Sequence, residues 1–292
     1  MGSSTSIQAS SVMRLAFYYP WFPKNWTQRG PDGREIYPYT KYHPSLGYYD
    51  SANRAIVDKH IDAMKYANID GGIASWWGQG KEEDRNFPTL LAAAEGRPFT
   101  WCIYHELESK HSLTVSDIES DLKYVREKYA DHPNYLRIDG RFVVFAYSTI
   151  EQRAEGCPMA SRWKQANTVN AFIVLKVFKD YGSCADQPDS WHQYAPAKSL
   201  VVCRKGRILG KTYSCTISPG FWWVVEHQPK LGRDLEGWRS SIRQMIASNA
   251  MFQLITTFNE HGEGTAVESC SEWDSKSGHG AYLDALHLNG KS

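Results

Sequence analysis

Short apolar runs alternate with amphipathic segments along most of the chain. The apolar runs are rich in β-branched and aromatic residues, as buried strands are. They predict strands over residues 13–19, 71–77, 99–106, 141–147, 171–178, 190–196, 213–220 and 252–258. Several of the segments between them carry apolar residues at helical spacing. These segments predict helices over residues 52–68, 85–95, 114–130, 159–167, 231–249 and 280–288.

Eight strands that are mostly separated by helices predict an α/β fold, a single (β/α)8 TIM barrel. The chain has 292 residues, which is an ordinary length for one such barrel. We expect the barrel to cover residues 12–292 and residues 1–11 to form a flexible N-terminal tail. A dinucleotide-binding sheet is disfavoured, because no GxGxxG motif follows the first strand.

The charges of the chain are nearly balanced, with 33 Lys and Arg against 32 Asp and Glu. Nucleic acids and anionic membranes both select clustered basic surfaces, so this balance argues against either as the main partner. No apolar stretch reaches the length of a membrane-spanning helix. We therefore expect no nucleic-acid partner and no membrane partner.

Aromatic residues are abundant, with 11 Trp, 17 Tyr and 11 Phe. Many stand beside glycine or proline rather than inside the apolar runs. Two interpretations are open at this point. The rings form a core of large side chains, or they line a cleft with flat faces that suit the apolar faces of sugar rings.

The six cysteines are Cys102, Cys157, Cys184, Cys203, Cys215 and Cys270. An even number permits disulfides and a secreted or extracellular location, although residues 1–11 hold no apolar segment of a signal peptide. Cys157 and Cys184 lie in loop-like stretches after neighbouring strands of the expected barrel, so we predict that they form a disulfide. Cys102 lies in an expected buried strand and is predicted to be free.

Metal-binding motifs are missing from the sequence. No CxxC, HxH or HExxH occurs, and no Cys/His spacing fits a zinc site. We therefore expect neither a catalytic metal nor a cofactor. Lys176, at the end of the fifth strand, could serve as a Schiff-base amine, but a strand-terminal lysine more often neutralises a carboxylate.

Polar and aromatic side chains follow each of the expected strands. In a barrel of this kind the carboxyl ends of the strands meet at one mouth, where active sites lie. We expect the following side chains to bind substrate there: Tyr18, Trp21, Trp76, Trp77, Tyr104, Glu106, Tyr147, His192, Tyr194, Phe221 and Asn259.

Two carboxylates, Glu260 and Glu263, follow the eighth strand in the stretch "FNEHGEGT". Paired carboxylates in an aromatic cleft suit glycosidic-bond cleavage, because one must carry a proton while the other stays ionised. Gly262 and Gly264 let the backbone turn, so that both side chains face inward. The alternative is a loop with two solvated acids; the position at the end of the eighth strand favours the catalytic interpretation.

The same stretch, "TFNEHGEGTAVE", resembles the "NEWxEGTxxEP" segment of glycoside hydrolase family 99, the endo-α-mannosidases. The segments "AFYYPWF", "HPSLGYYDS" and "HIDAMKYANIDGGIASWWG" are similar to that family's first strand and loop, first helix and second strand. The resemblance implies that Glu260 is the base that deprotonates the sugar 2-hydroxyl and that Glu263 is the general acid. It also implies a transient 1,2-anhydro sugar and net retention.

The resemblance further implies that Glu106, Tyr147 and Trp76 line the sugar subsites. One departure lies beside the acids: the family has Trp-His between them, where this chain has His261-Gly262. The chain is also shorter than a typical endo-α-mannosidase, so we do not infer an α-mannoside as the substrate.

Two functions follow: a retaining glycoside hydrolase acting on a poly- or oligosaccharide, or a catalytically silent carbohydrate-binding barrel. Two close acids favour the hydrolase, because a lectin gains little from them.

Overall fold

The computed structural model describes residues 12–110, 113–198, 207–208 and 211–291. The tail expected over residues 1–11 lies outside these described residues. Within them, no helix has both the length and the apolar composition needed to cross a membrane.

Eight parallel strands form the core of the molecule, and they confirm the expected barrel. They are β1 (Met13–Tyr18), β4 (Gly71–Trp76), β5 (Thr100–His105), β7 (Arg141–Ala146), β8 (Phe172–Lys176), β9 (Ser190–His192), β12 (Thr216–Ile217) and β13 (Phe252–Ile255). They are paired in the order β12-β13-β1-β4-β5-β7-β8-β9. The ring closes next to β12, where His192 and Ser214 form a parallel bridge.

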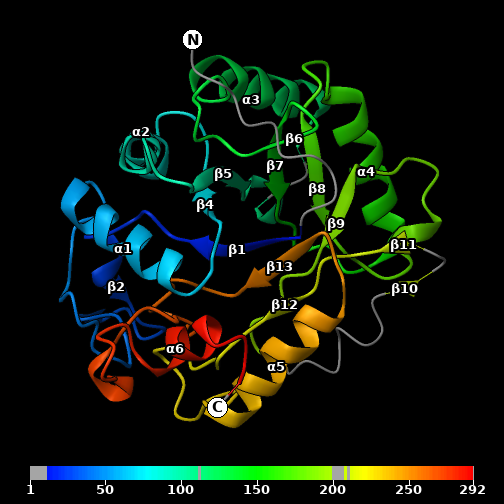
Figure 1. Cartoon of the computed structure of the whole chain (residues 1–292). Coiled ribbons are helices and arrows are strands. Elements are labelled where there is room, and N and C mark those ends of the chain that lie inside the picture. The colour runs from blue at the N-terminus through cyan, green and yellow to red at the C-terminus, as the bar shows by residue number, and fades with distance from the viewer. Residues whose placement is uncertain (1–11, 111–112, 199–206, 209–210, 292) are drawn as a thin grey trace.

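Six α-helices surround the barrel within the described residues (Figure 1). They are α1 (Arg54–Tyr66), α2 (Glu82–Ala94), α3 (Val115–Lys128), α4 (Arg153–Ala166), α5 (Leu235–Ala247) and α6 (Ala281–His287). Helices α1 to α4 each follow a barrel strand, α5 joins β12 to β13, and α6 follows β13. As far as the chain is described, β8 connects to β9, and β9 to β12, without an α-helix.

Several short strands and 3-10 turns lie outside the eight barrel strands and six helices. The pairs β2 (Gln28–Arg29) with β3 (Glu35–Ile36) and β10 (Arg207–Ile208) with β11 (Lys211–Thr212) form small antiparallel ribbons, and β6 (Arg137–Ile138) pairs with β7. The 3-10 turns are η1 (Lys24–Trp26), η2 (Leu107–Ser109), η3 (Tyr181–Ser183) and η5 (Ser271–Trp273).

Local chemistry explains where several helices begin. Asn53 caps α1 by accepting a hydrogen bond from the Ala55 amide, and Asp234 caps α5 in the same way. Thr114 and Asp117 form a reciprocal capping box at the start of α3. Helix α4 begins at Arg153, six residues before the predicted start at residue 159, because Pro158 is accommodated inside the helix.

Alternation along the strands sorts the side chains into two layers. Phe17, Tyr104, Phe145 and His192 contact one another inside the barrel. Their sequence neighbours point outward to the helices. Gly72 leaves room for one outward ring, since a Cβ there would lie 2.0 Å from Trp101. This alternation decides which strand-end residues reach the mouth.

The structure confirms the disulfide between Cys157 and Cys184, whose Cα atoms are 5.3 Å apart. Cys157 lies in α4 rather than in a loop, because that helix starts earlier than predicted, and Cys184 caps the η3 turn. Cys102 is free and buried, as expected, and so is Cys270. Cys203 lies outside the described residues.

Removing this disulfide is expected to destabilise the fold. The bridge closes a segment of 27 residues, so the Cys157→Ser/Cys184→Ser double variant should lose about 2–4 kcal/mol of unfolding free energy. Urea unfolding of both proteins under non-reducing conditions measures the difference. Equal stability of the variant and the parent would contradict this expectation, and the single variant Cys102→Ser serves as the control for losing a thiol.

Candidate active site

The two glutamates lie at the tip of a loop that begins after β13. Two contacts between Thr257 and Thr265 close the base of this loop. The Thr257 N–H donates to the Thr265 carbonyl, and the two hydroxyl oxygens are 3.0 Å apart. The Phe258 N–H donates to the carbonyl of Phe17 in β1. The loop is therefore closed on itself and tied to the barrel, so its tip has a defined place at the mouth.

The Glu260 carboxylate is buried at the tip, with 7% of the residue exposed. Its Oε1 accepts hydrogen bonds from the Gly262 N–H at 2.9 Å and the Glu263 N–H at 3.3 Å. The neighbouring β12 loop supports the tip, because the Trp222 N–H donates to the Glu263 carbonyl and the Val224 N–H to that of Gly262. Glu263 Oε2 is buried and accepts no hydrogen bond within the described part of the chain.

The two glycines of the loop are constrained to different degrees. Gly264 has a φ of 65°, and a Cβ there would lie 2.8 Å from the Trp222 carbonyl oxygen, so both conformation and space exclude other residues. Gly262 is tightly enclosed, so a larger residue would require its neighbours to shift. A Cβ at this position would lie 3.0 Å from ring carbons of Tyr39 and 3.2 Å from Glu260 Oε1.

A third carboxylate, Glu106, follows β5 and is buried at the same mouth. Its Oε1 accepts a hydrogen bond from the Ser75 hydroxyl at 3.0 Å. The pKa of Glu106 is raised to about 8, chiefly by burial and to a smaller extent by the charges of Glu263 and Glu83, while the Ser75 bond lowers it.

A pair of tyrosine hydroxyls lies among the three acids. The Tyr19 and Tyr194 hydroxyl oxygens are 2.7 Å apart. Burial raises the pKa of both phenols, and the charges of Glu106, Glu260 and Glu263 raise each of them further. The phenols stay neutral and can donate hydrogen bonds to a carboxylate or to a bound hydroxyl group.

The electrostatics of the acid pair favour one shared proton. Burial, and then the charge of Glu263, raise the pKa of Glu260 well above its usual range. Burial also raises the pKa of Glu263, while Lys230 lowers it. Burial and the charge of Glu263 therefore favour the proton on Glu260, whereas the two backbone donors at Oε1 stabilise the Glu260 carboxylate. These two hydrogen bonds lower the pKa of Glu260 without outweighing burial and the charge of Glu263.

Burial of these acids has a measurable cost in stability. For Glu106 the folded pKa of about 8 exceeds the ordinary 4.5, so its contribution to stability is present below pH 4.5 and is lost as the pH rises through 8. Glu106→Gln is expected to raise the unfolding free energy at pH 8.5 by about 2–4 kcal/mol, with little change at pH 4.5. Urea unfolding at both pH values tests this, and an equal effect at the two would refute it.

Two of the expected substrate residues point away from the acids. The Tyr18 hydroxyl contacts His60 Nδ1 in α1 at 2.9 Å, and the Trp76 indole N–H donates to Asp84 in α2 at 2.7 Å. Both side chains are fully buried between the barrel and its helices. Strand alternation explains this placement, because their neighbours Tyr19 and Ser75 take the inward positions.

Other expected residues lie at or under the mouth. Tyr147 is half-buried, and the charges of Glu106 and Glu263 raise its pKa after burial does so. Its ring contacts those of Tyr104 and Tyr194. His192 lies deeper, 3.0 Å from the Tyr104 hydroxyl, and burial and Lys176 lower its pKa to about 3. His192 is therefore a neutral support for Tyr104.

The remaining expected residues lie around these groups. Trp21 contacts the ring of Tyr19 at 4.5 Å, and Trp77 lies under the Lys110 ammonium. Phe221 lies in the loop after β12, with the Lys230 ammonium 5.4 Å from its ring. Asn259 is fully buried. Its Oδ1 accepts a hydrogen bond from the Tyr19 N–H, and its Nδ2 donates one to the Tyr19 carbonyl. Asn259 thus positions the loop rather than facing the mouth.

Three residues at or beneath the mouth are absent from the sequence-based set: Tyr19, Tyr39 and Glu268. Period-two alternation in the first strand could have found Tyr19, since Phe17 and Tyr19 share a face. No local pattern points to Tyr39, which comes from the long loop after β1. Among the described residues, no group of three or more His, Cys, Asp and Glu side chains is arranged to hold a metal ion.

Comparison with known proteins adds an independent line of evidence. A model of glycosyl hydrolase family 99 matches residues 15–161, which is half of the 292-residue chain. This match ends before the loop that carries Glu260 and Glu263. The chain is also 24% identical over 155 residues to the glycoprotein endo-alpha-1,2-mannosidase of Rattus norvegicus, and 23% identical to that of Mus musculus. Each alignment covers 43% of this chain and 33% of the relative, so the chain spans about a third of the length of these curated relatives.

Solved structures share the fold over nearly the whole chain. The GH99 endo-alpha-mannosidase from Bacteroides thetaiotaomicron superimposes with a TM-score of 0.73 at 19% identity, covering 98% of this chain and 96% of that one. A glycoside hydrolase-like protein superimposes with a TM-score of 0.65 at 15% identity and the same coverage. At these identities the likeness establishes the barrel fold.

Proposed function

Because the chain belongs to glycosyl hydrolase family 99, we propose that it is a retaining glycoside hydrolase that cleaves a poly- or oligosaccharide with Glu260 and Glu263 as its acid/base pair. The observation that carries this proposal is the loop tip itself. Two carboxylates, the buried Glu260 and the half-buried Glu263, stand three residues apart at the mouth of the barrel, beside the Tyr19–Tyr194 hydroxyl pair. A solvated loop would leave both acids exposed and their pKa values ordinary.

In the first step, Glu260 removes the proton from the 2-hydroxyl of the sugar. The freed oxygen attacks the anomeric carbon and forms a 1,2-anhydro sugar, while the bond to the leaving oxygen breaks. Glu263 gives its proton to that leaving oxygen. After this step Glu260 is protonated and Glu263 is ionised.

The second step reverses these roles. Glu263 removes a proton from water, which attacks the anomeric carbon and opens the anhydro ring. Glu260 returns its proton to the 2-oxygen. Both glutamates regain their starting states, and two inversions give net retention. The raised pKa values suit this exchange, because each acid must both carry and release a proton near neutral pH.

The substrate class is a carbohydrate, and we propose α-mannosyl chains as the first to test. The support comes from the names of the relatives and solved structures, which are endo-alpha-mannosidases. The disulfide between Cys157 and Cys184 supports a location in an oxidising compartment, such as the secretory pathway or the outside of the cell.

A glycan panel tests the hydrolase proposal directly. The protein is incubated with α-mannosyl oligosaccharides and with other poly- and oligosaccharides, and new reducing ends are measured. Release of reducing ends that stops in Glu260→Gln and Glu263→Gln supports the proposal. Binding of glycans without any new reducing end would favour the silent carbohydrate-binding barrel.

A further inference from the structure

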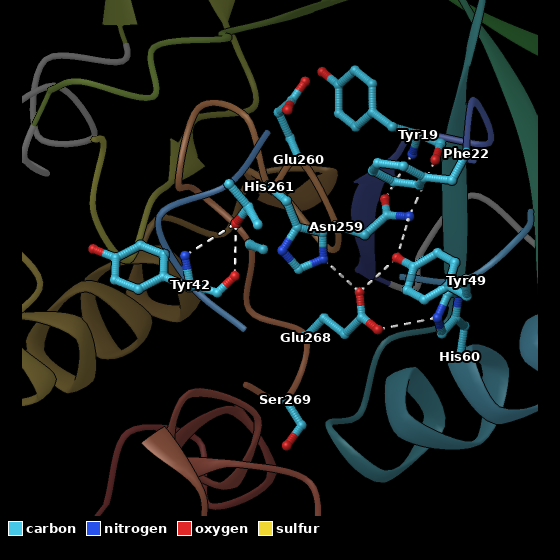
Figure 2. Close-up of polar contacts among 12 residues, drawn as sticks. Tyr19, Phe22, Tyr42, Tyr49, His60, Asn259, Glu260, His261, Glu268 and Ser269 are labelled. Carbon is cyan, nitrogen blue, oxygen red and sulfur yellow. Dashed lines mark hydrogen bonds and ion pairs between the residues drawn. The ribbon is translucent and has the colours of Figure 1, made fainter. Parts of the chain in front are cut away.

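A buried carboxylate that the mechanism does not use, Glu268, lies below Glu260 in the view of Figure 2. Its Oε2 accepts hydrogen bonds from His261 Nε2 at 2.9 Å and from the Tyr49 hydroxyl at 2.7 Å. Its Oε1 lies 3.2 Å from Nε2 of His60 in α1. One side chain thus joins the loop after β13 to the loop after β1 and to the first helix.

Both sequence neighbours of Glu260 are tied to this carboxylate. His261 is bonded to it directly. Asn259 is bonded to it through Tyr49, because the Asn259 amide donates to the Tyr49 hydroxyl at 3.3 Å and that hydroxyl donates to Glu268. Glu260 itself makes no bond to Glu268, so the carboxylate acts on the backbone that carries the base.

The charge of Glu268 is stabilised in spite of its burial. Burial raises its pKa, but the nearby His60 and His261 outweigh that effect and lower the pKa to about 2. The Tyr18 and Tyr49 phenols, which face the same cluster, have raised pKa values and stay neutral. An ionised carboxylate can accept from all of its donors at once, which a neutral amide cannot.

We propose that Glu268 is a positioning residue: through His261, and through Tyr49 and Asn259, it sets the backbone at Glu260 and with it the orientation of the acid pair. This inference rests on the proposed function for its kinetic part alone. His261 stands where the family motif has tryptophan, and an imidazole N–H keeps one ring donor available to Glu268. The ring of His261 is otherwise enclosed by Phe22 and Trp26.

The test compares Glu268→Gln and Tyr49→Phe with the parent protein. Glu268→Gln replaces one acceptor oxygen by a donor group, so at least one of its contacts is lost. Tyr49→Phe removes only the hydroxyl that links Glu268 to Asn259 and leaves the bond to His261 in place. Backbone hydrogen–deuterium exchange over residues 257–265, measured without any glycan, is expected to rise in both variants, and more in Glu268→Gln.

Kinetics on an α-1,2-linked mannosyl oligosaccharide supply the second measurement. We expect kcat to fall about 10–100-fold in Glu268→Gln, with KM nearly unchanged. A looser tip weakens the Gly262 and Glu263 N–H bonds to Glu260, which lower its pKa. The acidic limb of the kcat/KM profile should therefore move to higher pH, an effect that loss of folded protein cannot produce.

Asp121→Asn is the matched control, because Asp121 also holds a buried histidine, His105, at 2.9 Å but lies behind the barrel wall on α3. The Asp121→Asn variant should be less stable than the parent, with an unchanged kcat and an unchanged acidic limb of the kcat/KM profile. Unchanged exchange in both test variants overturns the proposal, as does wild-type kcat per folded molecule. If the parent cleaves no glycan, the proposed function fails, and the exchange data alone then support or overturn the positioning of the loop by Glu268.

Discussion

Glu263→Gln is expected to lower kcat on a natural glycan by about 10²–10⁴-fold, with folding and glycan binding retained. An alkoxide is a poor leaving group, and an amide has no proton to give it at a useful pKa. Glu263 Oε2 is buried without a hydrogen-bond partner in the described structure, so the substitution breaks no described bond at that atom. Initial rates with the parent and the variant measure the effect, and Glu236→Gln, an exposed acid of α5, is the control.

Substrates with different leaving groups test whether Glu263 is the proton donor. With an activated aryl glycoside, departure needs no proton, so Glu263→Gln should regain most of the lost rate. Burial and the charge of Glu263 favour the proton on Glu260, whereas the backbone hydrogen bonds at Oε1 favour an ionised Glu260. Rescue of Glu263→Gln, with none for Glu260→Gln, agrees with the hydrogen bonds; rescue of Glu260→Gln instead would reverse the two roles.

Glu260→Gln is expected to lower kcat by a similar factor, about 10²–10⁴-fold, on natural and activated substrates alike. The base is needed to make the 2-oxygen nucleophilic, and a better leaving group does not replace it. The amide keeps the size of the side chain and still offers an oxygen to the Gly262 N–H, so the loop should retain its shape. Rates on both substrate types, together with isothermal titration of the glycan, separate turnover from binding.

A 2-deoxy substrate tests the route through the anhydro sugar. It lacks the hydroxyl that Glu260 deprotonates in the proposed mechanism, so the parent protein should fail to cleave it. Normal hydrolysis would point to direct attack by a carboxylate, and Glu106, the third acid of the mouth, is the first residue to examine. Parent activity in both glutamine variants would remove the hydrolase interpretation of this loop.

The fold could be predicted from the sequence because its signals are local. Each buried strand appears as a short apolar run, and each amphipathic helix shows its own periodicity. Strand order then follows the chain, since each strand pairs with the next one along the barrel. The predicted start of α4 was wrong, because Pro158 is a strong local signal against a helix. Packing of the helix on the barrel overrides that signal.

The site could be predicted only in part. The position of Glu260 and Glu263 at the mouth could be predicted because they follow the last strand directly and occur within one short segment; their catalytic role stays a prediction. Tyr18 and Trp76 were placed at the mouth because they end their strands, but each strand presents alternate side chains inward and outward. In the structure Tyr18 is hydrogen-bonded to His60 and Trp76 to Asp84, on the helix side of the barrel.

The sequence by itself determined the elements of this protein, their order around the barrel, and the placement of Glu260 and Glu263 after the last strand. These features depend on residues close together in the chain. Only the tertiary structure decided what surrounds the acids. Tyr49 and Glu268 are 219 residues apart in sequence, yet they meet beneath the loop because closing the barrel brings its first and last strands side by side. Burial and neighbouring charge, which set the pKa values of the acids, arise from the same closure.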